Sequence, residues 1–425
     1  MCERFNIDDV ARINGIQVIR ERGGETFAVC PFCGNKAGKF SYIVSKGSKK
    51  NIYHCFSCEA RGNAIELHMK LSGEDFGEDE QAYKLAAKDI FKRLGSGFHA
   101  EPSRYERAEE VREAPKADEE TVSKTLFAVL KYCDLKERHK KDLLKRGLTE
   151  ADIKRFRFRS APTDPRAMCE HLLEEGYTLK GVPGFYIDKS GKWNFSVIKD
   201  GYLCPVFDGD RNLLTGFQVR LDKPRDGAKY LWVSSSGKES GTGSGAMCTL
   251  LPGANRKCII LTEGILKATV IYCLLKGAVT VVGVPGIKSL VHLKDVVERF
   301  KDNAYVIEAF DMDKALTEGL EPLYSEMIEK GIPMNTTDEK YRGVVKQQRI
   351  AQAAEDLRTR LLSEYALDSH DLKWDTKGRF WNGNLKGLDD FLLDYEDKGR
   401  FIQYIEELAE DDLKMRTFLK TTTAS

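Results

Sequence analysis

The stretch from residue 258 to residue 313 constrains the fold most, because three short apolar runs alternate there with two segments of helical spacing. Each apolar run is rich in β-branched residues and carries little charge before its end, which is typical of a strand buried on both faces. The alternation predicts a β-α-β-α-β unit with a parallel sheet. Glu263 ends the first run, and Asp311 and Asp313 end the third. Because ligands bind at the carboxyl ends of such strands, we expect the three acids to meet at one edge.

These three acids predict a site for a divalent cation. Two carboxylates about 4 Å apart repel each other by roughly 4 kcal/mol at an effective dielectric of 20, so acids do not gather there for stability. Oxygen ligands without a nearby His or Cys suit magnesium or manganese, which act on phosphate oxygens. An ordinary acidic junction between strand and loop is the alternative, but the Glu-Gly ending of an earlier strand favours the metal. Lys267, one helical turn after Glu263, is expected to lie near the same edge.

Four cysteines near the N-terminus predict a structural zinc site. Cys30 and Cys33 form one C-x2-C pair, and Cys55 and Cys58 form a second after a β-type segment. Four thiolates complete a closed tetrahedral site, and structural zinc supplies roughly 10–16 kcal/mol to a module too small to fold unaided. A thioredoxin-like redox motif has one such pair and does not account for two. Aromatic rings alternate with basic residues here; we expect the rings to form the small core and the charge to favour single-stranded nucleic acid.

Bulk composition limits the class of protein further. The 425 residues imply two to four domains, and a net charge of +1 requires any nucleic-acid surface to be local. No apolar run is long enough to span a membrane, and the charged N-terminus does not have the pattern of a secretory signal. The odd number of cysteines, 11, is typical of a reducing compartment. We therefore expect a cytoplasmic protein with no membrane partner.

The chain is expected to be an α/β multidomain protein. Its acid-rich, proline-containing stretch over 101–120 cannot bury a core and predicts a flexible linker or a solvated helix. The predicted parts are a zinc-ribbon DNA-binding domain over 1–98, a charged linker over 99–120, a basic subdomain of mixed α+β type over 121–255, the parallel α/β domain over 256–400, and a helical tail over 401–425.

A basic segment over 131–159 predicts contacts with nucleic-acid backbones. It contains Arg146 and a dense run that includes Arg155 and Arg157, and such clusters bind phosphates without reading sequence. The alternative is an exposed, charged helix. Near the C-terminus, Asp389 and Asp390 are either further metal ligands or the N-terminal acids of a helix, and their order alone does not decide between these roles.

Several of these motifs resemble bacterial DnaG-type primases across most of the chain. The run CPFCG followed by YHCFSCEARGNAIEL is similar to that family's zinc ribbon, with Cys33 where the family usually has His. The segment LKRGLTEADI is similar to the one that opens the family's catalytic core. The segments GFQVR and KYL resemble two family motifs, which implies that Arg220 and Lys229 contact template or nucleotide phosphates.

The resemblance also assigns roles to the acids. Thr262-Glu-Gly264 and Asp311-Met-Asp313 match the Toprim motifs, in which the Glu is catalytic or orders the metal and the Asp pair binds it. The family places an Asp where this chain has Lys267, which removes one acid and gives this lysine a place in the catalytic site. Its closing acidic motif implies Asp389 as a further magnesium or manganese ligand, with Asp390 as the rival.

The family resemblance implies a primase that makes short RNA primers on single-stranded DNA by metal-dependent nucleotidyl transfer. Its partners would be the template, nucleoside triphosphates and a replicative helicase supplied as a separate protein. The segments TEGILKA and KGLDDFL are more similar to primases of phages, plasmids or mobile elements than to a chromosomal primase. The alternatives are another Toprim enzyme, such as a nuclease, and a non-catalytic, zinc-dependent single-strand binding protein. Lys267 favours the non-catalytic alternative, and the retained Glu and Asp pair argues against it.

Overall fold

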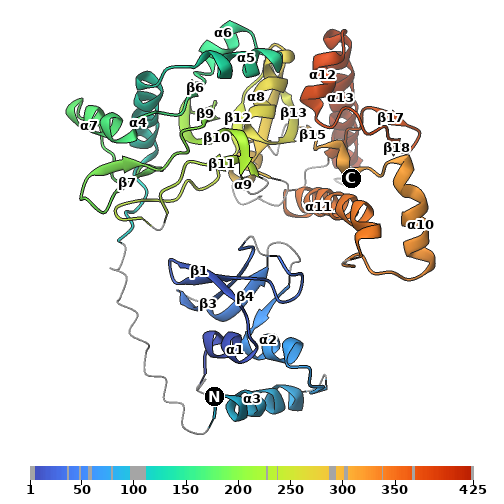
Figure 1. The fold of residues 1–425 in the computed structure, drawn as a ribbon. Coiled ribbons are helices and arrows are strands. Elements are labelled where there is room, and N and C mark those ends of the chain that lie inside the picture. Colours follow the sequence, from blue (N-terminus) through green and yellow to red (C-terminus); the bar gives the residue numbers. More distant parts are fainter. Residues whose placement is uncertain are drawn as a thin grey trace. The chain divides into compact units, whose positions relative to one another are not determined.

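A computed structural model describes residues 5–35, 38–46, 49–55, 60–77, 80–95, 112–225, 228–236, 238–286, 293–300, 305–336, 338–365 and 369–422. The chain forms two units, residues 1–111 (unit 1) and residues 112–425 (unit 2). In Figure 1, unit 1 is drawn in shades of blue, and unit 2 runs from green through yellow to red. Across the described ranges, no helix combines the length and the apolar character needed to cross a lipid bilayer. Each unit has its own hydrophobic core and is described by itself.

Unit 1 is a five-stranded antiparallel sheet with helices packed against it. The strands follow each other in chain order across the sheet. They are β1 (Val18–Arg22), β2 (Glu25–Ala28), β3 (Phe40–Lys46), β4 (Lys49–Cys55) and β5 (Arg61–Asn63), and the helices are α1 (Ile7–Ile13), α2 (Ala64–Leu71) and α3 (Glu80–Leu94). Asn63 and Glu66 form a capping box that fixes the start of α2 directly after β5, which closes the ribbon against its helices.

The aromatic rings of unit 1 form its core, as the sequence predicts. Phe40, Tyr42 and Tyr53 are buried, and the ring of Phe32 stacks on Tyr53 with centroids 5.8 Å apart. Ile7 of α1 and other apolar side chains of the helices join the same cluster. Rings that are buried against each other are not free to stack on bases, so these side chains stabilise the unit rather than form a nucleic-acid surface.

Unit 2 is built on one continuous sheet with the strand order β11-β10-β9-β12-β14-β13-β15-β16, and β6 pairs with β9. The pairs β13–β14, β13–β15 and β15–β16 are parallel, which confirms the predicted β-α-β-α-β unit. Strand β12 runs antiparallel to β14 and joins this parallel part to the antiparallel strands β9, β10 and β11. One sheet therefore contains strands from both sides of residue 255, where the sequence predicts a boundary between two subdomains.

The bounds of the unit 2 elements follow. Its strands are β6 (Arg159–Ser160), β7 (Phe185–Ile187), β8 (Trp193–Phe195), β9 (Gly201–Asp208), β10 (Leu213–Arg225), β11 (Ala228–Trp232), β12 (Thr249–Leu251), β13 (Asn255–Glu263), β14 (Val279–Val284), β15 (Tyr305–Glu308), β16 (Ser369–Asp371), β17 (Thr376–Lys377) and β18 (Phe380–Trp381). Its helices are α4 (Glu119–Tyr132), α5 (Glu137–Lys145), α6 (Glu150–Arg155), α7 (Pro165–Glu174), α8 (Ile265–Leu274), α9 (Leu293–Phe300), α10 (Glu321–Glu329), α11 (Arg342–Tyr365), α12 (Leu388–Asp394) and α13 (Lys398–Thr422), with short 3₁₀ turns η1 (Met312–Lys314), η2 (Glu318–Leu320) and η3 (Glu339–Tyr341).

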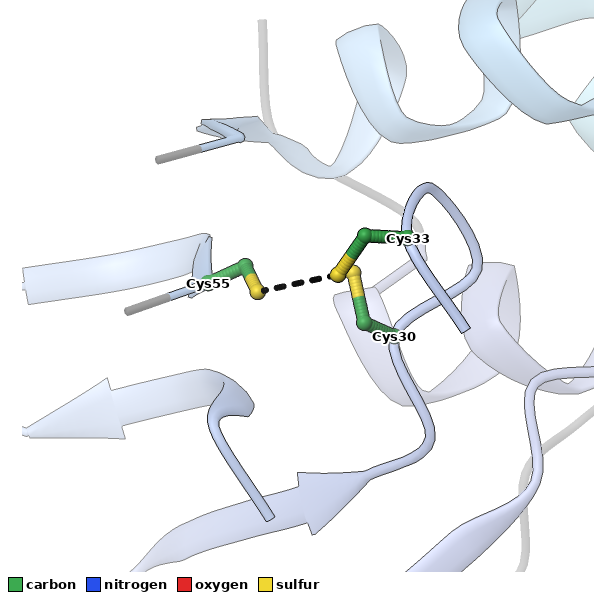
Figure 2. Close-up of side chains that lie close together, drawn as sticks. All are labelled: Cys30, Cys33 and Cys55. Carbon is green, nitrogen blue, oxygen red and sulfur yellow. Dashed lines mark hydrogen bonds between the residues drawn. The ribbon is translucent and has the colours of Figure 1, made fainter. Parts of the chain in front are cut away.

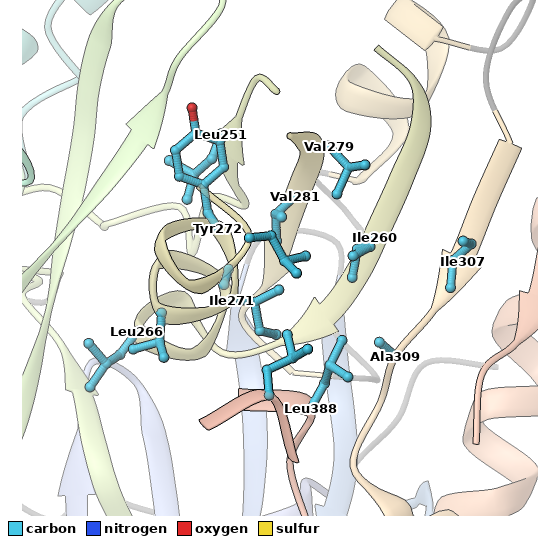
Figure 3. Packing of buried hydrophobic residues seen from close by; sticks show 14 of the residues in the cluster. Leu251, Ile260, Leu266, Ile271, Tyr272, Val279, Val281, Ile307, Ala309 and Leu388 are labelled. Carbon is cyan, nitrogen blue, oxygen red and sulfur yellow. The ribbon is translucent and has the colours of Figure 1, made fainter. Parts of the chain in front are cut away.

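The parallel strands are covered on both faces, as their apolar sequences require. Ile260, Val281 and Ile307 face the cluster formed with α8, α12 and α13, part of which Figure 3 shows around Ile271 and Leu388. The alternating strand positions face a second cluster with α9 and α11. Burial of each such side chain contributes roughly 1.5–3 kcal/mol, so the sheet is a rigid base for the side chains at its carboxyl edge.

Residues 112–118, at the end of the segment predicted as a linker, lie along unit 2. The N–H of Ala114 donates to the carbonyl of Gly241 at 2.8 Å, and the N–H of Ala117 donates to the carbonyl of Gly181 at 2.9 Å. Ala114 is buried. These residues therefore belong to unit 2, and residues 99–111 of the predicted linker lie outside the described residues.

Candidate functional site

Three of the four predicted zinc ligands lie together in unit 1 (Figure 2). The sulfur atoms of Cys30, Cys33 and Cys55 all lie within 4.8 Å of one another, and the Sγ atoms of Cys33 and Cys55 are 4.0 Å apart. A tight turn after β2, closed by the N–H of Gly34 donating to the carbonyl of Cys30, positions the first pair, and Cys55 ends β4. Cys58 lies outside the described residues.

The chemistry of this cysteine cluster fits zinc. Cys30 and Cys55 are buried. Burial raises the pKa of the Cys30 thiol, and the neighbouring sulfur atoms of Cys33 and Cys55 add to that rise. Three converging sulfur atoms suit a zinc ion, which takes thiolate ligands directly. The cluster supplies three donors of a structural zinc site.

The second candidate site is the acidic edge, which we define as Glu263, Asp311, Asp313 and Asp389. Glu263 ends β13 and Gly264, with φ 98°, turns the chain into α8. Beyond β15, the N–H of Ala309 donates to the carbonyl of Leu261 at 2.8 Å, and the hydroxyl of Thr262 donates to the carbonyl of Ala309 at 3.1 Å. These bonds continue the parallel pairing past the strand end and bring the Asp311 segment alongside Glu263.

Strand β15 ends earlier than the sequence predicts. Its last residue is Glu308, and Asp311 and Asp313 lie in a loop and in the turn η1. Alternation along a strand therefore does not direct these two side chains. They are held instead by the 3₁₀ turn, whose Met312 N–H donates to the carbonyl of Lys386 at 2.8 Å. The loop before α12 is thereby fixed to the aspartate segment.

Two lysines pair with the aspartates of this edge. Lys267 Nζ forms an ion pair with Asp311 Oδ1. Lys386 Nζ lies 2.7 Å from Asp313 Oδ2 and 3.3 Å from Asp311 Oδ2, so it bridges both acids. Burial alone lowers the pKa of Lys386, but its hydrogen bonds and charge interactions with Asp313 and Asp311 raise it above its ordinary value.

The structure separates the roles of Asp389 and Asp390. Asp390 Oδ2 accepts the N–H of Gly387 at 3.2 Å and caps α12. Asp389 is buried, and among the described residues its Oδ1 has no hydrogen-bond donor. A side chain at position 387 would collide with that oxygen, so glycine makes room for it. An unpaired buried carboxylate oxygen beside a charged cluster is costly unless a ligand completes it.

Electrostatic coupling shows that the acids share one environment. Burial raises the pKa of Glu263, the charge of Asp311 adds to the rise, and those of Lys267 and Lys386 oppose it. Burial likewise raises the pKa of Asp389, and the charge of Lys267 opposes this. Within the described part of the chain, the cysteine cluster is the one group of three donors whose ligand atoms all lie within 4.8 Å of one another, so the carboxylates are more widely spaced.

The hard oxygen donors and the unpaired Asp389 oxygen fit a magnesium or manganese ion at the acidic edge. The two ammonium groups now occupy contacts that such an ion would make to Asp311 and Asp313. The sequence predicts Lys267 near this edge, but not its direct pairing with a predicted metal ligand. Lys386 was missed, because nothing in a Lys-Gly-Leu segment indicates which loop it will face.

Arg146 and Arg220 come together around one carboxylate. Arg146 caps the end of α5, and its Nε donates to Asp142 Oδ2 at 3.2 Å, while Arg220 Nε lies 3.5 Å from the same oxygen. The hydroxyl of Tyr202 also donates to it at 2.8 Å. Burial alone raises the pKa of Asp142, but Tyr202 and the two arginines lower it below its ordinary value. Asp142, which the sequence did not single out, therefore holds Arg146 by a hydrogen bond and pairs with Arg220, whose buried Nε has no hydrogen-bond partner among the described residues.

Tyr230 lies beside this arginine pair. The guanidinium of Arg220 lies over the ring of Tyr230, 5.3 Å from its centroid. Burial raises the pKa of Tyr230 to about 12; among the charges that act on it, Arg220 and Arg146 oppose the rise and Asp389 adds to it. One tyrosine thus senses both arginines and an acid of the edge. The arginines suit the phosphate oxygens of a ligand, and the acids suit a cation bound to those phosphates.

The other predicted contact residues are not gathered at this place. Lys229 is exposed on β11, next to Tyr230, and successive strand residues point to opposite faces. Arg155 lies over the rings of Phe156 and Tyr272, and Arg157 lies over the ring of Phe127. Both arginines are exposed, so the basic run divides between two neighbouring surfaces instead of forming one continuous strip.

A buried charge network supports the aspartate loop from behind. Lys314, which follows Asp313, is buried; its Nζ lies 2.5 Å from Asp371 Oδ1 and donates to the carbonyl of Leu372 at 3.2 Å. Burial lowers the pKa of Lys314, and Asp371 opposes this. The loop is thus held between Lys386 on one side and β16 on the other. This contact spans distant parts of the chain, and the sequence carries no signal for it.

Parts of this chain match known proteins. Residues 1–93 match the family model described as the CHC2 zinc finger. The chain is 30% identical over 228 residues to a DNA primase of Geobacillus stearothermophilus, a match that covers 51% of this chain and 36% of that protein. It is 24% identical over 205 residues to a DNA primase of Treponema pallidum, covering 48% of this chain and 32% of that protein.

The aligned region spans only about a third of the length of these relatives. Among solved structures, the zinc-binding and RNA polymerase domains of the Aquifex aeolicus primase align with a TM-score of 0.36 and 17% identity, covering 83% of each chain. A score this low does not establish a common arrangement. The chain is a CHC2-type zinc ribbon joined to a mixed α/β unit with parallel strands. In sequence, it is homologous to bacterial DNA primases over about half of its length.

Proposed function

We propose that this protein is a DNA primase, which synthesises short RNA primers on a single-stranded DNA template from nucleoside triphosphates. The observation that carries the proposal is the acidic edge, where the Asp311–Asp313 segment is held beside Glu263 and, among the described residues, the buried Asp389 Oδ1 has no hydrogen-bond donor. The pair Arg146 and Arg220, which meets around Asp142, supplies basic groups. A nucleoside triphosphate with its divalent cation presents the complementary charges. The homology to bacterial DNA primases supports the same activity.

The residues of the chain divide the work of nucleotidyl transfer as follows. Arg146 and Arg220 bind phosphate oxygens; Asp142 pairs with both guanidinium groups and the Tyr230 ring lies beneath that of Arg220, which limits the side-chain entropy lost on binding. Glu263, Asp311, Asp313 and Asp389 are the ligands for magnesium or manganese. That ion, when bound, neutralises charge on the triphosphate and favours deprotonation of the attacking 3′-hydroxyl.

The remaining basic residues and the zinc ribbon are proposed to hold the template. Arg155, Arg157 and Lys229 are exposed and suit backbone phosphates, which need no fixed geometry. Zinc, held by Cys30, Cys33, Cys55 and Cys58, maintains the fold of unit 1. A replicative helicase is the proposed protein partner, and a phage, plasmid or other mobile element is the proposed origin.

Primer synthesis by the purified protein tests the proposal. The full chain, loaded with zinc, is incubated with single-stranded DNA, labelled ribonucleotides and magnesium or manganese. We expect short labelled products from the wild type and none from Glu263→Gln or Asp311→Asn. Asp390→Asn is the matched control, since Asp390 caps α12 instead of facing the edge. Cleavage of the template without synthesis would instead identify a nuclease.

One observation favours a second candidate, a non-catalytic single-strand binding protein. The ion pair of Lys267 with Asp311 and the contacts of Lys386 partly neutralise the acids that a metal would need. If this pairing is permanent, the edge is structural. The same assay distinguishes the two, because a binding protein retains the template and makes no primer in either metal.

A further inference from the structure

The ammonium groups of the two lysines at the acidic edge can exchange their aspartate partners for another ligand. The edge contains four carboxylates and two ammonium groups, so an excess of negative charge remains when all are ionised. Neither lysine donates to the unpaired oxygen of Asp389, although the charge of Lys267 acts on that carboxyl. The lysines therefore neutralise the edge only in part, and they leave its most buried acceptor for another ligand.

The backbones that carry these lysines are fixed, whereas their side chains are partly exposed. Lys267 lies between Leu266 and Ala268, which are buried in the core of unit 2. The carbonyl of Lys386 accepts the Met312 N–H at 2.8 Å. The side chains are 24% exposed for Lys267 and 46% exposed for Lys386. Rotation about the four-carbon stem can therefore move each charge by several ångströms without disturbing the fold.

We propose that Lys267 and Lys386 are internal counter-ions, which a divalent cation displaces from Asp311 and Asp313 and which then bind the phosphate oxygens of a nucleoside triphosphate. The ammonium groups and the cation compete for the same carboxylate oxygens. Each lysine therefore weakens the binding of the cation to the nucleotide-free protein. Once released, each lysine strengthens the binding of the triphosphate, so the two effects of one side chain have opposite signs.

The triphosphate half of this inference rests on the proposed function, whereas the cation half does not. Both are measured on the full chain with its cysteine site filled by zinc. Manganese affinity is obtained without nucleotide from the electron paramagnetic resonance signal of free manganese. ATP affinity is obtained by equilibrium dialysis at saturating magnesium. Neither measurement depends on primer synthesis.

We expect Lys267→Met and Lys386→Met each to tighten manganese binding and to weaken ATP binding, by on the order of tenfold in each direction. Lys377→Met is the matched control, because Lys377 is an exposed lysine of unit 2 whose partner, Glu318, is outside the edge. It should change neither affinity. Manganese binding that is unchanged or weaker in both methionine variants, or ATP binding that is unchanged, would overturn the proposal.

A measurement on the wild type keeps the inference testable if a methionine variant does not fold. In lysine-selective ¹⁵N spectra, assigned with Lys267→Arg and Lys386→Arg, the Nζ signals of both lysines should shift on addition of magnesium and again on addition of ATP. Signals that stay in place at saturating magnesium would contradict displacement. If the affinities shift as expected but no primer is made, the primase proposal fails and the counter-ion inference stands.

Discussion

The cysteine cluster of unit 1 and the acidic edge of unit 2 use their surroundings in opposite ways. Cys30 and Cys55 are themselves members of the core of unit 1, packed with Phe40 and Tyr53. The acids of unit 2 lie at the rim of a sheet whose two faces are already filled by apolar side chains. We therefore expect zinc to be part of the fold in unit 1, whereas the cation that we propose for unit 2 would serve the chemistry and not the fold.

The comparison predicts its largest effect for removal of zinc. Cys55→Ser, or a zinc chelator, should unfold residues 5–95 while the strands of unit 2 stay protected, because structural zinc supplies roughly 10–16 kcal/mol to a module of this kind. Hydrogen exchange followed by mass spectrometry reads the two units separately. Cys273→Ser, in unit 2, is the control and should leave unit 1 protected. Equal protection of unit 1 with and without zinc would contradict the contrast.

The acidic edge should show the reverse pattern, with loss of activity and no loss of fold. Glu263→Gln or Asp311→Asn should lower primer synthesis by about 10²-fold or more, because each removes a ligand whose charge stabilises the transition state. The melting temperature of unit 2 should not fall for Glu263→Gln, since this change reduces repulsion among neighbouring carboxylates. Asp311→Asn also removes the ion pairs with Lys267 and Lys386, so a small fall is expected for this variant. A calorimetric scan beside the primer assay checks this. A variant that loses activity only by unfolding would count against a catalytic edge.

Within unit 2, the fixed arginine pair should matter more than the exposed arginines. Arg220→Met should weaken binding of ATP and magnesium by about tenfold, because its guanidinium is held in place by Asp142 and Tyr230. Arg157→Met should change ATP binding little and should instead reduce the salt dependence of single-stranded DNA binding. Titrations at several salt concentrations separate the two outcomes. Equal effects of the two variants on ATP affinity would contradict the difference between the paired and the exposed arginines.

The smallest predicted effect is a pH dependence of unit 2. His139 is buried; burial lowers its pKa from 6.5, and a hydrogen bond with Asp222 opposes this. His139 therefore binds a proton more readily in the unfolded chain than in the folded chain. The contribution of neutral His139 to the free energy of unfolding is complete above pH 6.5 and is lost as the pH falls through the folded pKa of this residue. The slope is at most about 1.4 kcal/mol per pH unit. Urea unfolding at pH 5 and 7.5 should show it in wild type, and His139→Gln should remove it.

Local patterns made part of this molecule predictable. The β-α-β-α-β order followed from apolar runs and helical spacing, and the cysteine cluster followed from the spacing of its pairs. Contacts between distant segments were not predictable in the same way. Lys386 bridges Asp311 and Asp313 from a loop more than seventy positions later in the chain, and Asp142 joins arginines of α5 and β10. Such pairs depend on tertiary packing, which no local pattern encodes.

Some local predictions were incomplete because the same residues are compatible with two local structures. Asp389 and Asp390 both suit the start of a helix, and only the packing of α12 against α8 buries the first and leaves the second to cap. The extension of β15 to Asp311 was also wrong. The 3₁₀ turn at Met312 ends the extended backbone early, and it is fixed by a hydrogen bond to the carbonyl of Lys386.

Anomalous diffraction from crystals soaked in manganese tests most directly whether the acidic edge holds a divalent cation. We expect an anomalous peak within about 2.2 Å of carboxylate oxygens of Asp311 and Asp313, with the ammonium groups of Lys267 and Lys386 moved away. Crystals that show manganese elsewhere, or none, while both lysines remain paired with the aspartates, would contradict it.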